Sequence, residues 1–320
     1  MTNGFTAAKQ ANTGEMRFHE QAGASEGEDA DLSGCSAALC LSDISVRLAA
    51  GADEVRAAQK LRYQVFYEEG GARADGNALF EQSDLDAFDD IADHLIVIDR
   101  RRAAAGLNHG VVGNYRLLRG NARPRGRDFY SSGEFDIDVL LQTDARLLEL
   151  GRSCVLREYR HCSVLQLMWT ALAKYVGEHD IELMFGCASF HGTDAGRIQE
   201  QLAYLHHYHL APQALQPHAI GGETLPMDRL DRQDIDPLRA LKGLEPLIRG
   251  YLRLGAVVGR GAHVDRQFNT IDVCMILPTA ALSKRHMRRF EREGRFQLRS
   301  VTVDHSPAVA DIVPVLPSIA

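Results

Sequence analysis

The chain has 320 residues, of which 45% are hydrophobic and 25% are charged, and its formal net charge is -7. This composition is that of a globular protein with one large or two modest domains, and the negative charge argues against nucleic-acid binding as its main role. The chain has no apolar run of about 18 residues and no signal-peptide pattern at its start, so we expect a cytoplasmic protein.

The first predicted elements follow a polar start. Residues 1–42 are rich in Gly, Ala, Ser and Glu and carry few large apolar side chains, which predicts a disordered tail. Ile44, Val46 and Leu48 alternate with polar residues, so we expect a strand there. Asp53 is the expected N-cap of a helix that ends in the next glycine-rich segment.

An acidic loop comes next. Its five aspartates are Asp84, Asp86, Asp89, Asp90 and Asp93. Carboxylates so close together repel one another unless a cation or a hydrogen-bond donor meets some of them. The composition leaves two interpretations open, a solvated loop and a pocket for a cationic group of a substrate.

Two strands are expected on either side of a short basic hairpin. The strands are 94–98 and 111–118, and the hairpin lies around 106–110. An arginine-rich loop at 121–127 and an acidic, partly apolar connection at 133–141 then lead to the next strand.

This next strand carries two charged residues in its middle. Residues 147–155 are apolar enough for a buried strand, yet they include Glu149 and Arg152. Side chains alternate along a strand, so two positions three apart should point to opposite faces, but a β-bulge at Gly151 would turn both towards one cleft. Because a buried ion pair is costly to desolvate, the pattern indicates either a functional site or a pair that fixes the strand to its neighbour.

A basic turn and a helix follow. Arg157 and Arg160 lie in the turn, Ser163 is the expected N-cap, and one apolar helical face continues to Gly177. Free N–H groups at such a helix start, beside two arginines, form an anion-binding site. With a further strand at 182–190, this arrangement is typical of a site for a phosphate-bearing ligand.

The second half of the chain is less regular. His206, His207 and His209 end the next helix, but no cysteine or acidic partner falls at ligand spacing, so we expect no metal site there. Pro237 and Pro246 bracket short helical segments. The six cysteines show no C-x-x-C spacing, which favours reduced thiols.

Two more strands are expected at 256–264 and 270–277. A polar motif lies between and within them, and the residues alone do not reveal its role. Its members are Asp265, Asn269 and Asp272.

Four sequence blocks resemble the acyl-homoserine-lactone synthases and their relatives within the Gcn5-related N-acyltransferase fold. They are LRYQVFYEE, DLDAFDDIADH, VVGNYRLLR and LLELGRSCV. The second half, with LMFGCASFHGTD and GYLRLGAVVGRGAHVDRQFNTIDVCMILP, is similar to the L-ornithine N-alpha-acyltransferases of bacterial ornithine-lipid synthesis. The resemblance extends from about Ile44 to Phe290 and is specific because several motifs keep the same order and spacing.

The resemblance implies an α+β fold, with a Gcn5-related N-acyltransferase-like central mixed sheet flanked by helices and a C-terminal extension. The expected layout is a tail at 1–42, an acyltransferase domain at 43–293 and a second tail at 294–320. Within the domain, 44–190 form the core and 191–293 the family-specific part.

The resemblance also implies a reaction. A 3-hydroxyacyl group on acyl carrier protein is transferred directly to the α-amine of L-ornithine, which gives a lyso-ornithine lipid. Since a thioester is already activated, neither a cofactor nor a covalent enzyme intermediate is expected. The turn at 157–162 has side chains where coenzyme-A-using members have glycines, which favours a carrier protein over free coenzyme A as the donor.

Candidate site residues fall into three groups. Those expected in catalysis are Glu149, Arg152 and His94. Those expected to bind the acceptor are Arg62, Asp86 and Asp89, with the two aspartates meeting the δ-ammonium of ornithine. Those expected to grip the phosphate of the phosphopantetheine arm are Arg157, Arg160 and Ser163.

The expected helix at 280–293 is strongly basic. It is either a solvated face or a surface that docks the acidic carrier protein or touches anionic lipid at the inner membrane. Two rival functions also stay open, an acyl-homoserine-lactone synthase that uses S-adenosylmethionine and a non-catalytic, haemolysin-like lipid-binding protein.

Overall fold

The computed structural model describes residues 43–122, 128–160 and 162–281. The two predicted tails and nearly all of the predicted basic helix lie outside these ranges, as does most of the arginine-rich loop. No helix in the described part is both long and apolar enough to cross a membrane.

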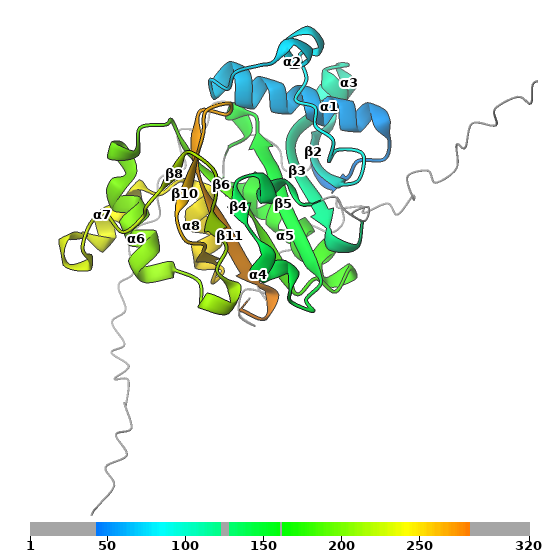
Figure 1. Ribbon diagram of the computed structural model, residues 1–320. Coiled ribbons are helices and arrows are strands. Elements are labelled where there is room, and N and C mark those ends of the chain that lie inside the picture. The colour runs from blue at the N-terminus through cyan, green and yellow to red at the C-terminus, as the bar shows by residue number, and fades with distance from the viewer. Residues whose placement is uncertain (1–42, 123–127, 161, 282–320) are drawn as a thin grey trace, which may run out of the picture. The chain divides into compact units, whose positions relative to one another are not determined.

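Nine strands of the described residues form one mixed sheet (Figure 1). Their order is β1-β2-β3-β5-β6-β11-β10-β8, with β9 beside β11, and the central pair β5 and β6 is parallel. The strands are β1 (Ile44–Leu48), β2 (Asp93–Asp99), β3 (Val111–Arg119), β5 (Leu147–Val155), β6 (Leu183–His191), β8 (Thr224–Leu225), β9 (Val257–Val258), β10 (Ala262–Asp265) and β11 (Thr270–Pro278). A separate two-stranded sheet consists of β4 (Phe135–Asp136) and β7 (His218–Ala219).

Helices cover both faces of the sheet. The α-helices are α1 (Ala52–Tyr63), α2 (Gly76–Glu81), α3 (Arg100–Ala104), α4 (Asp138–Leu141), α5 (Cys162–Glu178), α6 (Gln199–His209), α7 (Pro237–Gly243) and α8 (Pro246–Arg253). In Figure 1, α4 lies in front of the sheet while α5 and α8 lie behind it. α5 contacts β1 and β2, and α8 contacts β6 and β11, so each half of the sheet has its own helix on that face.

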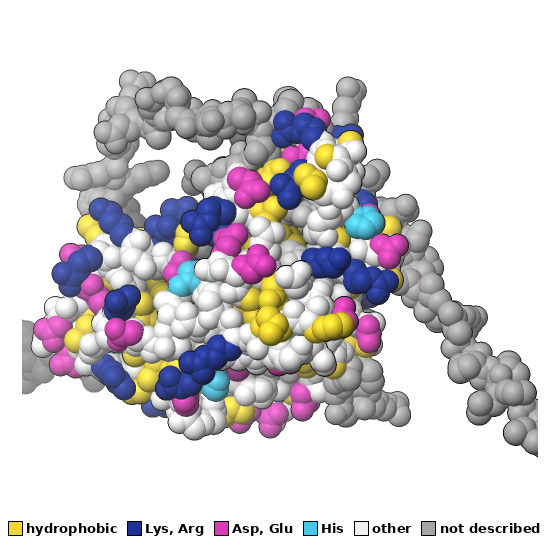
Figure 2. All heavy atoms as spheres, turned by 90° about the horizontal axis from the view of Figure 1, so that it is seen from above, with side chains coloured by type: hydrophobic (Ala, Val, Ile, Leu, Met, Phe, Trp, Pro, Cys, Tyr) yellow, Lys and Arg dark blue, Asp and Glu magenta, His cyan; other side chains and the backbone are white. Residues whose placement is uncertain are grey.

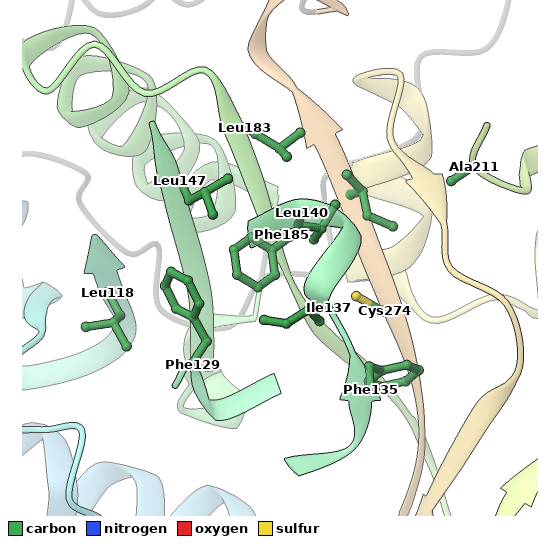
Figure 3. Close-up of a cluster of buried hydrophobic side chains, with 11 residues drawn as sticks. Leu118, Phe129, Phe135, Ile137, Leu140, Leu147, Leu183, Phe185, Ala211 and Cys274 are labelled. Atoms are coloured by element: carbon green, nitrogen blue, oxygen red, sulfur yellow. The ribbon is translucent and has the colours of Figure 1, made fainter. Parts of the chain in front are cut away.

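The segment that carries β4 and α4 closes the front face over the central strands (Figure 3). Phe135, Ile137 and Leu140 from this segment are buried against Phe185 of β6 and Cys274 of β11. The sequence indicated only an acidic connection here because its short apolar stretches have no helical or strand period over a useful length.

Most strand positions agree with the sequence-based prediction. The strands predicted at 44–48 and 147–155 are observed with those bounds, and the strand predicted at 256–264 is divided into β9 and β10. The predicted basic hairpin is wrong in form, because α3 occupies the connection between β2 and β3.

Both predicted N-caps are also wrong. Gly51 is the N-cap of α1, and Asp53 lies in its first turn. α5 begins at Cys162, so Ser163 is already a helical residue. An error of one or two residues at a helix end is expected of sequence patterns, because several polar residues near the start satisfy the same preference.

Candidate active site

The two central strands separate where a bulge interrupts β5. β5 pairs with β6 only along its first three residues, of which Glu149 opposite Phe185 is the last. On its other edge β5 pairs with β3, and the segment of β5 between Gly151 and Cys154 is one residue longer than the β3 segment opposite it. The predicted bulge is therefore present, but the residue in the left-handed conformation is Arg152 (φ 51°) and not the glycine before it.

The gap between the separated strands has a small apolar pocket on the α8 side. Gly186 is the first β6 residue beyond the last pair, and a Cβ there would collide with the carbonyl oxygen of Leu150. The pocket is lined by Leu150, Met184, Phe185, Gly186, Tyr251, Met275 and Leu277. This lining suits an uncharged chain rather than a charged group.

Glu149 is a buried carboxylate held by backbone donors. Its Oε2 accepts a hydrogen bond from the N–H of Tyr130 at 3.0 Å, and its Oε1 accepts one from the N–H of Ser131 at 2.7 Å. Burial raises the pKa of Glu149, while the hydrogen bonds from Ser131 and Tyr130 act in the opposite direction. A carboxyl group with a raised pKa suits proton transfer near neutral pH, and its oxygens can accept further hydrogen bonds.

Three arginines and three aspartates form a closed ring of alternating charge, here called the Arg–Asp ring. Each arginine contacts two of the aspartates, and each aspartate contacts two of the arginines. In order, the contacts are Arg62–Asp84 (2.8 Å), Asp84–Arg152 (3.0 Å), Arg152–Asp86 (3.1 Å), Asp86–Arg116 (2.5 Å), Arg116–Asp89 (3.2 Å) and Asp89–Arg62 (2.7 Å). Three of the five aspartates of the acidic loop are therefore neutralised within the fold, whereas Asp90 is exposed.

The predicted pair between Glu149 and Arg152 is not what the structure shows. The guanidinium of Arg152 donates to Asp84 and Asp86 and lies over the ring of Tyr130, 4.5 Å from its centroid. Glu149 contacts the backbone of the same tyrosine, so both side chains do face one side of the sheet as the bulge predicts. They meet through Tyr130 and not directly.

The two aspartates expected to bind the substrate ammonium already have arginine partners. Burial alone would raise the pKa of Asp89, but hydrogen bonding and charge from Arg62, with the charge of Arg116, hold it well below its usual range. The pKa of Asp86 is likewise lowered against its burial, by Arg116 and Arg152. An ammonium group at Asp86 or Asp89 would have to compete with these guanidinium groups.

His94 lies behind the Arg–Asp ring on β2. It is buried, its Nε2 is 3.2 Å from the carbonyl oxygen of Asp89, and burial lowers its pKa. β2 is separated from β5 by β3, so His94 lies two strands from the gap. Its predicted role as a proton relay stays a prediction, and its position suits support of the ring.

The basic turn lies at the start of α5, as predicted. Arg160 contacts Glu69 at 2.7 Å and donates to the carbonyl oxygen of Val155 at 2.8 Å, and Arg157 is 3.7 Å from the same glutamate. Both arginine side chains are substantially exposed, at 75% for Arg157 and 43% for Arg160. Arg157 and Arg160 share Glu69, and Glu158 of the same turn pairs with Arg102 at 3.5 Å, so three guanidinium groups face two carboxylates here.

A second acidic cluster lies on the same face of the sheet as Glu149. Glu134, Asp265 and Asp272, here called the carboxylate trio, each place an oxygen within 4.8 Å of the others. Burial, followed by the charge of Asp272, raises the pKa of Glu134 to about 8, and burial also raises the pKa of Asp272. No arginine, lysine or histidine of the described residues forms an ion pair with the trio.

Sequence reasoning missed two of these residues. Arg116 is 2% exposed and lies in the interior of β3, where a charged residue inside an apolar strand was an available signal like that at Glu149. Glu134 had no comparable signal. It lies just before β4 and reaches Asp272 of β11 only because the fold brings these distant segments together.

The surface near α1 and α2 shows no single dominant charge. Figure 2 shows basic, acidic and apolar side chains interspersed on this upper face of the molecule.

Comparison with known proteins places the chain in a family. Residues 61–170 match the acetyltransferase (GNAT) domain model. The chain is 45% identical over 255 residues to the L-ornithine N(alpha)-acyltransferase of Rhodobacter capsulatus, covering 78% of this chain and 96% of that one. It is 40% identical over 256 residues to the enzyme of the same name from Brucella abortus, covering 79% of this chain and 91% of that one.

Among solved structures, the fold is similar to that of a CoA-dependent acyl-homoserine lactone synthase, BjaI. The TM-score is 0.47 and the sequence identity 13%, over 82% of this chain and 92% of that one. Because the sequence identity to the curated relatives extends over nearly their whole length, the chain belongs to the L-ornithine N(alpha)-acyltransferase family and has the GNAT fold.

Proposed function

We propose that this protein transfers a 3-hydroxyacyl group from acyl carrier protein to the α-amine of L-ornithine, which gives a lyso-ornithine lipid. Membership of a family whose curated members are named for ornithine acylation is the observation that carries the proposal. The geometry supports it, because the separated strands, the buried carboxylate and the basic turn are the parts that such a transfer needs.

The reaction is a direct acyl transfer. The free α-amine attacks the thioester carbon, the N–C bond forms, and the C–S bond breaks with its electron pair going to sulfur. One proton leaves the amine and one proton is taken up by the thiolate, so no net redox change occurs. The protein has to place the amine, accept a proton and stabilise the negative oxygen.

Glu149 suits the proton transfer. It is the last β5 residue paired with β6, so it lies at the point where the gap begins. Two backbone N–H groups fix its carboxylate, and burial raises its pKa towards the range in which a general base works best. Arg152 then acts beside it as an orienting group, held by the Arg–Asp ring.

The bulged part of β5 suits oxyanion stabilisation. Beyond Glu149 the edge of β5 that faces β6 has no strand partner, so backbone N–H groups on this edge are available to a thioester oxygen. The amide of Asn114 donates to the carbonyl oxygen of Arg152 at 3.0 Å, which fixes the bulge.

The turn before α5 suits a single phosphate. Arg157 and Arg160 are exposed cations at a helix start, and the side chains of this turn stand where a close approach of pyrophosphate would need glycines. A carrier protein presents one phosphate on its phosphopantetheine arm, so we propose it as the donor in preference to free coenzyme A.

The test is a product assay with defined donors and acceptors. Purified protein is incubated with 3-hydroxyacyl-acyl carrier protein or 3-hydroxyacyl-coenzyme A and with a panel of amino acids and S-adenosylmethionine, and the products are identified by mass spectrometry. We expect an α-amide of ornithine that keeps its free δ-amine, formed faster from the carrier protein. A homoserine lactone product, or no amide with any amino acid, would contradict the proposal.

A variant tests the role of Glu149 within this reaction. Glu149→Gln keeps an acceptor for the backbone donors but removes the base, so we expect kcat to fall by roughly 10²- to 10⁴-fold. Glu182→Gln is the matched control, because Glu182 is half exposed just before β6 and contacts Arg146. A Glu149→Gln protein that remains folded and keeps its kcat would remove Glu149 from the chemistry.

A further inference from the structure

We propose that the carboxylate trio of Glu134, Asp265 and Asp272 receives the side-chain ammonium group of the amino-acid acceptor. The inference rests on the proposed function, since it concerns the acceptor of that reaction. The trio, rather than the acidic loop before β2, is then the part of the protein that selects a cationic amino acid.

The distribution of charge separates the two acidic clusters. In the Arg–Asp ring, three guanidinium groups balance three carboxylates, and every carboxylate has two arginine partners. The trio has three carboxylates and no ion pair to a described residue. A cationic group would meet no ion-paired arginine, lysine or histidine of the described residues there. It would take the place of the proton that Glu134 holds near neutral pH, because burial and the charge of Asp272 raise the pKa of this group to about 8.

The spacing of the trio fits an ammonium nitrogen. Three atoms within 4.8 Å of one another share a centre that is at most about 2.8 Å from each. This value lies within the usual range for a charged N–H group and a carboxylate oxygen. An alkylammonium group has three N–H donors, so one oxygen from each carboxylate would satisfy all of them.

Three buried side-chain oxygens in or next to the trio have no hydrogen-bond partner in the described part of the chain. Glu134 Oε2 and Asp272 Oδ1 are buried without a hydrogen-bond partner among the described residues, and so is Oγ1 of Thr270. Thr270 is 7% exposed, lies directly opposite Asp265 and is two residues from Asp272 on the same face of β11. Buried polar atoms normally have partners, so these three atoms, two of which are oxygens of the trio itself, indicate a missing polar ligand.

Glu149 and the trio lie on the same face of the sheet, with Ser131 and Cys187 between them. Ser131 donates its N–H to Glu149 at 2.7 Å, and its hydroxyl lies 3.5 Å from the sulfur of Cys187. The charges of Glu134 and Asp272 in turn raise the pKa of Cys187, whose burial is the main cause of its high value. The two amines of extended ornithine are roughly 6 Å apart, which suits a site that spans these neighbouring side chains.

An ammonium group fits the trio better than a metal ion does. Ca²⁺ takes six to eight oxygen ligands, and Mg²⁺ requires a near-octahedral set that usually includes several waters. Glu134 and Asp272 are 6% and 4% exposed, which leaves little room for such a shell. One oxygen each from the buried Glu134 and Asp272 and from the partly exposed Asp265 matches the donors of an ammonium group without further ligands.

The experiment compares ornithine with 2-aminopentanoate, which has the same carbon chain but no side-chain amine. Wild-type protein should prefer ornithine strongly in kcat/KM. Asp272→Asn should lower kcat/KM for ornithine by about 10- to 100-fold and leave the value for 2-aminopentanoate within about threefold. Asp265→Asn, at a partly exposed position, should have the same selective effect if the buried variant does not fold.

Asp99→Asn is the matched control, because Asp99 is a buried carboxylate that accepts hydrogen bonds from Tyr159 and Arg101 at the far end of β2. For this control variant, the ratio of kcat/KM for ornithine to kcat/KM for 2-aminopentanoate should equal the ratio found for the wild type. Equal losses for both acceptors in the trio variants would overturn the proposal, as would the absence of a preference in the wild type. A requirement for Mg²⁺ or Ca²⁺ that a chelator abolishes would overturn it in favour of a metal.

A binding measurement separates this proposal from the proposed function. Without any acyl donor, ornithine should raise the melting temperature of the wild type but not that of Asp272→Asn, whereas 2-aminopentanoate should raise neither. If the wild type acylates no amino acid, the proposed function fails. The thermal shift still tests whether the trio binds the side-chain ammonium group, because it needs no acyl donor. Equal shifts in wild type and variant would overturn it.

Discussion

At the scale of single residues, Asp89 shows how strongly the Arg–Asp ring depends on each member. Its carboxylate accepts hydrogen bonds from Arg62, from Arg116 and from the amide of Gln59 at 3.0 Å. All four side chains are at least nine-tenths buried. Loss of the negative charge would therefore leave guanidinium charge uncompensated in a place that water does not reach.

Asp89→Asn should lower the free energy of unfolding by about 3–5 kcal/mol, because it breaks a buried ion pair from one side. Urea denaturation followed by circular dichroism measures the change. Asp53→Asn is the control, since Asp53 forms an exposed pair with Arg56 at 3.5 Å and its loss should change stability by less than ~0.5 kcal/mol. Similar small effects for both variants would show that the ring is not a structural element.

Glu134 should make the free energy of unfolding fall as the pH rises. Burial and the charge of Asp272 raise its pKa to about 8 in the folded protein, against an ordinary value of 4.5, and Asp265, Cys187 and Tyr130 also face it. Between these values the folded state holds a proton that the unfolded state releases, so this group makes the free energy of unfolding fall as pH rises through the window.

Glu134→Gln removes this titration. We expect the melting temperature of the variant to rise relative to that of the wild type as the pH is raised from about 5 to 8. Differential scanning calorimetry at several pH values measures the difference. If the melting temperatures of the wild type and the variant change with pH in parallel, Glu134 is already ionised in the folded protein at the lower pH.

At the scale of secondary-structure elements, the close approach of β5 and β6 just beyond their last pair depends on one position without a side chain. A Cβ at Gly186 would collide with the carbonyl oxygen of Leu150, so any larger residue has to push the strands to a new spacing. Gly186 therefore allows β6 to contact Leu150 where the pairing ends, and the Arg152 bulge follows directly on β5.

Gly186→Ala should lower the free energy of unfolding by about 1–3 kcal/mol and reduce kcat/KM for the acyl donor by at least ~10-fold, because it changes the gap directly. Gly177→Ala in α5 is the control, since a Cβ there meets no atom within 4 Å and should stabilise the helix by up to ~1 kcal/mol. An active, stable Gly186→Ala protein would show that the gap does not hold the donor.

The turn before α5 should act on the donor alone. Arg160→Ala removes one of two exposed cations beside Glu69, so we expect the KM for the acyl carrier protein donor to rise by roughly 10-fold with little change in kcat. Arg146→Ala is the control, because Arg146 is also exposed and pairs with Glu182. A lower kcat without a change in KM would assign Arg160 to the chemistry instead of to donor binding.

At the scale of the whole molecule, the C-terminal part is continuous with the N-terminal core. β11 pairs with β6 along its full length, from Thr270 opposite His191 to Pro278 opposite Leu183. The ring of Trp169 in α5 lies edge-on to that of Tyr251 in α8, with centroids 5.0 Å apart. The residues after β6 therefore complete the sheet on which the site is built.

The sequence predicted the long strands well because each has a distinctive local pattern. Apolar runs bounded by turns located β3, β5, β6 and β11, and two charged residues inside one such run located the gap. The short elements β4 and α4 were missed because they have too few residues to show a period. The pairing of Arg152 with the acidic loop instead of Glu149 depends on the bulge geometry, which local sequence does not specify.

The carboxylate trio was the least predictable feature. Asp265 and Asp272 could be marked as an unusual polar motif, but their role needed a partner from another part of the chain. Glu134 becomes that partner only when the segment before β4 folds over β6 and β11. Contacts between distant segments are a property of the packed sheet and leave no spacing rule in the sequence.

The closed Arg–Asp ring also predicts how the protein responds to ionic strength. Mobile ions screen exposed charges over a Debye length of about 8 Å near 0.15 M salt, but they act much less on buried pairs. Adding potassium chloride should therefore weaken attraction of an acidic donor protein to Arg157 and Arg160 while leaving the buried, charge-balanced ring intact. A salt titration should raise KM for the carrier-bound substrate with kcat nearly constant. Salt would then distinguish donor binding from the chemical step without any mutation.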